Sequence, residues 1–196
     1  MDRLPAVGAS VLALAVLAAA CEEKSRSEPA PPAGRVNAVK AAPAKEVTAE
    51  AFCDVHYPAD KAPAFALPAM AVPAPEATGW RWFNLWATWC KPCVAEIPRL
   101  QEWRQRLGAK VTLVLVSVDE NDQVVADYRK THPEIGSGAR LADPKGLPAW
   151  LKTVGLDEAA PIPVHVFVDP SGKTRCVRAG GVGEPDYPGV ERVLSE

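Results

Sequence analysis

The sequence of 196 residues predicts an α/β domain in which a mixed central sheet carries helices on both faces. From residue 80 onward, strand-like and helix-like patterns alternate, and a β-hairpin and a last helix close the series. The first of these strands is apolar at both odd and even positions of residues 82–87. Such a strand has both faces buried, so it is expected at the centre of the sheet.

Residues 1–20 are expected to form an export segment. Arg3 precedes a charge-free run, and three alanines stand directly before Cys21. This pattern resembles a bacterial lipobox, in which Cys21 is lipidated, although Ala18 stands where that motif usually has leucine. Cleavage by an ordinary signal peptidase, or retention as an uncut membrane anchor, are the alternatives. All three deliver the chain to an oxidising compartment, either lipid-anchored at the membrane facing the periplasm or periplasmic.

Residues 21–50 are rich in Ala, Pro, Glu and Lys and lack a long apolar periodicity, so they are predicted to be a disordered tether. The folded domain is then expected over residues 51–196. The formal net charge is only −2, and the sequence contains no basic cluster of the kind that binds nucleic acid.

Within the domain, residues 51–79 are irregular, and the prolines of residues 62–68 allow edge strands only. Periodicity and end signals predict the other elements. Strands are expected at 80–88, 111–118, 139–142, 162–168 and 174–178, and helices at 92–107, 121–131, 147–154 and 187–195. Pro92 suits the first position of its helix, Pro98 is expected to kink it, and Gly108 is expected to end it.

Two cysteines, Cys90 and Cys93, stand where the central strand gives way to this helix. Backbone N–H groups and the helix dipole favour a thiolate at such a position, below the free cysteine pKa of about 8.5. The helix end can contribute up to about 2 kcal/mol, whereas an exposed charge such as Lys91 contributes about 0–1 kcal/mol. We therefore predict a dithiol/disulfide redox site, with Cys90 as the exposed nucleophile and Cys93 as the buried resolving thiol.

The remaining cysteines of the domain, Cys53 and Cys176, are predicted to form a structural disulfide, because exported proteins rarely keep two free thiols. A second redox pair is the alternative. Cys53 and His56 have a metal-like spacing without a second pair of ligands nearby, so no metal site is predicted. No cofactor is predicted either.

Over residues 62–195 the chain resembles the thioredoxin fold, and most closely the membrane-tethered thiol-disulfide reductases of TlpA/ResA type. The resemblance rests on residues 83–93, which include Trp89, Lys91 and Pro92 around the two cysteines, on Glu96 and Pro98, and on Pro163 before a late strand. It implies that Pro163 is cis and lies against the cysteines. It also implies that Glu96 assists proton transfer, whereas position alone equally allows a charge complementing the helix N-terminus. Asn84 replaces the buried acid of thioredoxin itself.

The resemblance implies an exported reductase that acts on disulfide-bearing client proteins and is kept reduced by a membrane electron donor. Cytochrome c maturation and the reduction of copper-site cysteines are the expected roles. A DsbA-like oxidant or isomerase is an alternative within the same chemistry. The alternative from another class is a copper-binding module that uses Cys90, Cys93 and His165.

Overall fold

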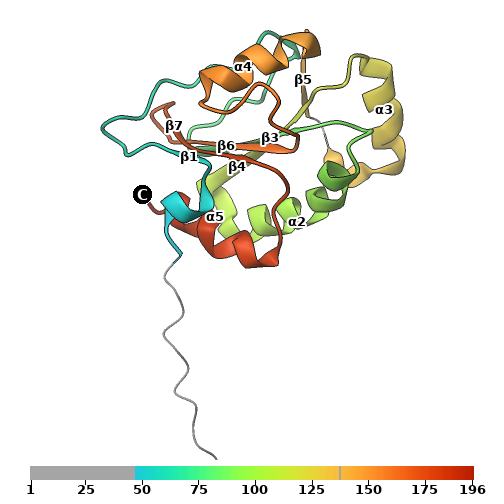
Figure 1. The fold of residues 1–196 in the computed structure, drawn as a ribbon. Coiled ribbons are helices and arrows are strands. Elements are labelled where there is room, and N and C mark those ends of the chain that lie inside the picture. Colours follow the sequence, from blue (N-terminus) through green and yellow to red (C-terminus); the bar gives the residue numbers. More distant parts are fainter. Residues whose placement is uncertain (1–46, 137) are drawn as a thin grey trace, which may run out of the picture. The chain divides into compact units, whose positions relative to one another are not determined.

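The computed structural model describes residues 47–136 and 138–196, which form a seven-stranded mixed sheet with the strand order β1-β7-β6-β3-β4-β5-β2 (Figure 1). The expected export segment, Cys21 and most of the expected tether lie outside the described residues. The strands are β1 (Val55–His56), β2 (Met70–Val72), β3 (Trp80–Trp86), β4 (Val111–Ser117), β5 (Ala139–Leu141), β6 (Val164–Val168) and β7 (Thr174–Ala179).

Strand β3 occupies the centre of the sheet, as its two-sided apolar pattern predicts. It pairs parallel with β4 and antiparallel with β6. Residues 82–86 of β3 are all buried. The parallel pairing brings the ends of β3 and β4 to the same edge of the sheet, with Trp86 opposite Ser117. The loop that carries the cysteine pair begins after the end of β3, at that edge.

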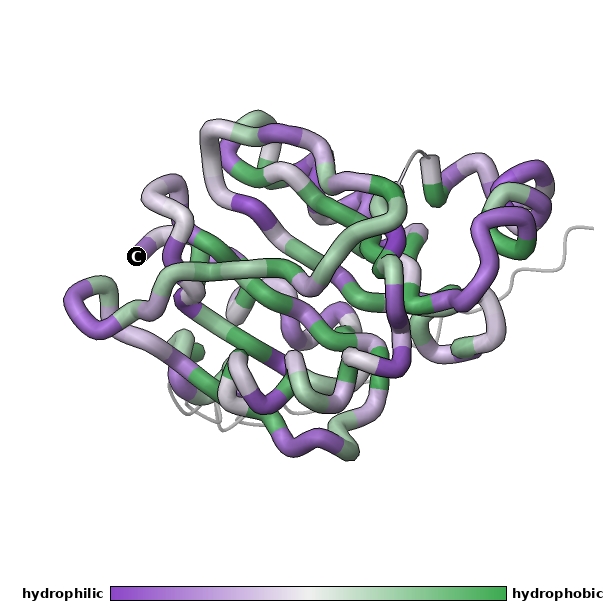
Figure 2. The backbone as a smooth tube through the Cα atoms, turned by 90° about the horizontal axis from the view of Figure 1, so that it is seen from above, coloured by the Kyte–Doolittle hydropathy of each residue, from purple (hydrophilic) through white to green (hydrophobic). Residues whose placement is uncertain are grey.

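Helices cover both faces of the sheet (Figure 1). Helix α4 lies on one face, and α1, α2 and α5 lie on the other, while α3 lies toward the side of β5. In Figure 2 the segments that cross the middle of the domain are largely hydrophobic, and many of the hydrophilic residues lie in outer loops and outer helical turns. The helices are α1 (Ala49–Phe52), α2 (Lys91–Leu107), α3 (Asp122–Thr131), α4 (Leu147–Thr153) and α5 (Tyr187–Val193).

Helix α2 begins one residue before the predicted start, so Pro92 is its second residue and Cys90 is the capping residue. The prediction missed this because a cysteine is not a usual helix cap. The helix continues through Pro98 and ends at Gly108, whose φ of 67° is the left-handed conformation that glycine adopts without steric cost.

The N-terminal part of the domain is more regular than predicted. Helix α1 begins at Ala49, inside the range assigned to the tether, because Thr48 caps it and its Ala49 and Phe52 side chains are buried. Phe52 packs against α5 at Gly189, where an added Cβ would lie 2.6 Å from the ring. The expected edge strands at 62–68 are reduced to one bridge between Ala64 and Lys173, and the sheet edges are instead β1 and β2.

Among the residues that the structure describes, no helix has the length and apolar character needed to span a bilayer.

Candidate active site

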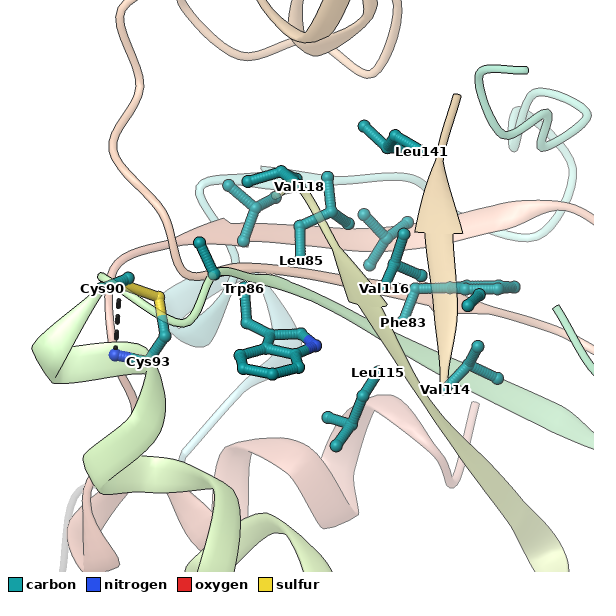
Figure 3. Close-up of a cluster of buried hydrophobic side chains, with 14 of the residues drawn as sticks. Phe83, Leu85, Trp86, Cys90, Cys93, Val114, Leu115, Val116, Val118 and Leu141 are labelled. Carbon is teal, nitrogen blue, oxygen red and sulfur yellow. Dashed lines mark hydrogen bonds between the residues drawn. A yellow bond between two sulfur atoms is a disulfide. The ribbon is translucent and has the colours of Figure 1, made fainter. Parts of the chain in front are cut away.

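The two cysteines form a disulfide at the start of α2 (Figure 3). Cys90 is the N-cap, and its Sγ accepts a hydrogen bond from the backbone N–H of Cys93 at 3.3 Å. A thiolate at Cys90 in the reduced protein would therefore sit at the positive end of a 17-residue helix. Local geometry thus stabilises negative charge on the sulfur that leads the helix.

The two sulfurs differ in their access to solvent less than predicted. Cys90 is 5% exposed, against the exposed position expected for it, and Cys93 is fully buried. Cys90 is covered because the loop before β6 packs over the cap: the carbonyl oxygen of Ile162 lies 3.8 Å from its Sγ. Cys90 nevertheless lines a surface groove whose lining does not include Cys93, and the nucleophile and resolving roles stay predictions.

The loop over Cys90 has an unusual backbone. The peptide bond between Ile162 and Pro163 is cis, as the family resemblance implies. Pro163 is buried, and its carbonyl accepts the N–H of Gly180 at 2.8 Å. The chain that enters β6 thus lies against the sulfur of Cys90 at this cis bond.

The groove beside Cys90 has a volume of about 840 Å³. Its lining is mainly apolar and comes from the cysteine loop, the chain after β4, α4 with the turn before it, and the chain before Pro163. Trp89 belongs to the lining with 68% of its surface exposed, and so do the charged residues Lys91 and Glu120. An exposed tryptophan beside an apolar groove is typical of a binding surface.

Glu96 is buried under the sheet, one helical turn after Cys93. Its Oε1 accepts a hydrogen bond from Asn84 Nδ2 at 2.8 Å, and its Oε2 accepts one from the backbone N–H of Val182 at 2.9 Å. The Nε2 atom of His165 lies 3.4 Å from Oε1. Glu96 therefore faces the sheet, where β3 and the segment after β7 donate hydrogen bonds to it.

Sequence reasoning missed the residue that fixes the cysteine loop. The Asp119 carboxylate accepts the backbone N–H of Thr88 at 3.0 Å and the Thr88 hydroxyl at 2.8 Å, and Ser117 Oγ also donates to it at 2.8 Å. Asp119 does not cap α3, because Asn121 provides that cap. The position of Asp119 directly after β4 could have indicated this contact. Strand β4 runs parallel to β3, which leads into the cysteine loop, so the ends of the two strands meet at one edge of the sheet.

Away from this site, Cys53 and Cys176 form a disulfide between the end of α1 and β7. His56 lies between two carboxylates, with Nδ1 3.4 Å from Glu50 and Nε2 2.9 Å from Glu196. In residues 47–136 and 138–196, this trio forms the one cluster of three or more potential metal ligands.

Both nitrogens of His165 face protein groups, so no observation favours the copper site proposed for Cys90, Cys93 and His165.

Comparison with known proteins places these features in a family. Residues 58–177 match the model of the AhpC/TSA family, which is more than half of the chain. The chain belongs to the AhpC/TSA family. Its curated relatives include the thiol-disulfide oxidoreductase ResA of Bacillus cereus, at 29% identity over 91 residues, covering 46% of this chain and 49% of the relative. ResA of Oceanobacillus iheyensis is 32% identical over 104 residues, covering 50% and 48%.

This AhpC/TSA-family chain spans about half the length of those curated relatives. It also resembles two solved structures. A secreted thiol-disulfide isomerase from Corynebacterium glutamicum superposes with a TM-score of 0.54 at 18% identity, covering 72% of this chain and 92% of that one. A DsbF homologue from Corynebacterium diphtheriae gives 0.51 at 20% identity, covering 72% and 90%. These likenesses show the thioredoxin-like α/β fold that the sequence predicted.

Proposed function

We propose that the protein is a thiol-disulfide oxidoreductase that reduces disulfides in client proteins through Cys90 and Cys93. The observation that carries the proposal is the position of Cys90: it caps α2, is bonded to Cys93 in the first turn of that helix, and borders an apolar groove beside the cis bond at Pro163. The ResA relatives, which are thiol-disulfide oxidoreductases by name, support the same chemistry.

The proposed reaction transfers two electrons from the dithiol to a client disulfide. The Cys90 thiolate attacks one client sulfur, a mixed disulfide forms, and the other client sulfur leaves as a thiolate that takes up a proton. Cys93 then gives its proton to Glu96 and attacks the Cys90 sulfur. The disulfide between Cys90 and Cys93 forms, and the second client sulfur leaves as a thiolate that takes up a proton from solvent, while Glu96 releases its proton to solvent. The form in the structure is the oxidised product, and a donor dithiol must reduce it before another turnover.

We also propose that the domain works outside the cytoplasm, tethered at the membrane through lipidated Cys21. The pattern of residues 1–20 supports export, as does the disulfide between Cys53 and Cys176, because structural disulfides persist in oxidising compartments. A membrane donor of reducing equivalents, and clients among maturing cytochromes c or copper-site proteins, belong to the same proposal and rest on the family resemblance.

Reduction of insulin tests the proposed activity. With dithiothreitol as the electron source, the protein should accelerate precipitation of the insulin B chain well above the rate with dithiothreitol alone. Protein whose reduced Cys90 and Cys93 have been alkylated, as verified by mass spectrometry, serves as the matched control and should fall to the background rate. Equal rates with the native and alkylated proteins would refute the proposal.

A further inference from the structure

The buried carboxylate of Asp119 holds Thr88 by both of that residue's hydrogen-bond donors. Its oxygens accept the backbone N–H of Thr88 at 3.0 Å and the Thr88 hydroxyl at 2.8 Å. A third donor is the hydroxyl of Ser117, at 2.8 Å. A buried carboxylate costs free energy unless donors surround it, and two of these three donors come from one residue of the cysteine loop.

Thr88 is a central residue of the turn that leads to the proposed nucleophile. The N–H of Cys90 donates to the carbonyl of Ala87 at 3.1 Å, which closes a turn with Thr88 and Trp89 at its centre. Among the described residues, the bonds to Asp119 are the only side-chain hydrogen bonds that these two central residues make. The place of Cys90 at the start of α2 therefore follows from where Thr88 is held.

The segment that carries Asp119 is also part of the groove. Val118 and Glu120, on either side of it, line the groove together with Cys90. This segment is itself fixed to the sheet: the N–H of Val118 donates to the last carbonyl of β3 at 2.8 Å, and Arg140 of β5 donates to the carbonyl of Asp119 at 3.1 Å. The carboxylate thus joins the turn to a groove wall that the sheet holds in place.

We propose that Asp119 is a positioning residue that holds the turn of residues 87–90 so that Cys90 Sγ caps α2 and Trp89 lines the groove. The proposal rests on the proposed function, in which Cys90 attacks as a thiolate. The N–H of Cys93 stabilises that thiolate only while Sγ stays within hydrogen-bond reach, which the structure places at 3.3 Å. Asp119 acts through its bonds to the turn, since a negative charge near Cys90 would by itself disfavour the thiolate.

The pH dependence of Cys90 alkylation separates position from charge. The full-length protein carries Cys93→Ala, and iodoacetamide labelling of the peptide that contains Cys90 is followed by mass spectrometry. Loss of the anchor in Asp119→Ala should raise the pKa of the Cys90 thiol by about half a unit or more, which lowers the thiolate fraction below that pKa about threefold. A role through charge predicts the opposite sign, because removing a negative charge lowers the pKa.

Asp119→Asn is the conservative variant. Its amide oxygen can accept the Thr88 N–H, and its NH2 group can donate to the Thr88 hydroxyl, so the turn keeps both contacts without the charge. The pKa of the Cys90 thiol should therefore stay close to that of the parent protein. Every variant keeps the charged side chains that line the groove with Cys90, which are Lys91, Glu120, Lys145 and Glu158.

Asp169→Ala is the matched control, because Asp169 ties a turn in the same way at the other end of β6 from Pro163. Asp169 is buried and accepts the backbone N–H groups of Ser171 at 2.9 Å and Lys173 at 3.1 Å, as well as the Ser171 hydroxyl at 2.6 Å. Its loss should destabilise the domain without moving the pKa of the Cys90 thiol.

An unchanged pKa in folded Asp119→Ala, a fall in Asp119→Asn, or an equal rise in Asp169→Ala would overturn the proposal. If Asp119→Ala fails to fold, Thr88→Val decides: it removes one of the two donors, should give a smaller rise, and overturns the proposal if the pKa is unchanged. Iodoacetamide replaces any client protein. A failure to reduce insulin would therefore count against the proposed function, while the labelling still decides the role of Asp119.

Discussion

Cys93→Ala is expected to turn the catalyst into a trap for its clients. Cys90 keeps its place at the start of α2 and can still attack a client disulfide. The mixed disulfide then lacks an internal thiol to resolve it, and turnover should fall by at least about a hundredfold. Non-reducing electrophoresis should show a client adduct that disappears when dithiothreitol reduces the mixed disulfide.

The matched variant for this experiment is Cys90→Ala, which should be equally inactive but should form no adduct. The buried position of Cys93 gives it no approach to the groove, so it cannot replace the missing nucleophile. Adducts of similar yield in both variants would show that the two sulfurs are interchangeable, and would contradict the assigned roles.

Loss of the disulfide between Cys53 and Cys176 should produce the largest change in stability. The bond closes a loop with a sequence separation of 123 residues. In the chain-entropy description, such a crosslink contributes about 4–5 kcal/mol by restricting the unfolded chain. Urea unfolding of Cys53→Ala, in a background with Cys90 and Cys93 replaced by serine, should show a loss of this order in the free energy of unfolding.

Cys176→Ala separates the crosslink from core packing. Cys176 is fully buried, whereas Cys53 is partly exposed, so only the replacement at 176 also opens a void in the core. Both variants should lose the crosslink contribution, and Cys176→Ala should lose slightly more. A loss below about 1 kcal/mol in Cys53→Ala would show that the bond adds little to the folded state.

The central part of the fold was predictable because its signals are local. Strand β3 is apolar on both faces, and α2 has apolar residues at helical spacing and a glycine at its end. The short elements α1, β1 and β2 lack such signals. Strand β1 has only two residues and forms because it pairs with β7, about 120 positions later in the chain. Pairing between strands so far apart in the chain produces no local sequence pattern from which it could be predicted.

The candidate site likewise contains positions that could be predicted from the sequence and contacts that could not. The positions of Cys90, Cys93 and Glu96 could be predicted, because Cys90 caps one helix and the other two follow in it at spacings of three. The contacts of His165 with Trp82 and Glu96 could not, since they depend on the register that sets Asn84 opposite His165. The hydrogen bond from Thr88 to the Asp119 carboxylate likewise depends on how the ends of β3 and β4 align.

The reduction potential of the Cys90–Cys93 pair tests the central claim most directly. Equilibration with glutathione or dithiothreitol buffers, followed by thiol labelling and mass spectrometry, measures it on the intact protein. A client reductase requires a value near that of thioredoxin, about −270 mV. A value near that of DsbA, about −120 mV, would mean that the pair oxidises its clients, and would contradict the proposed direction of electron flow.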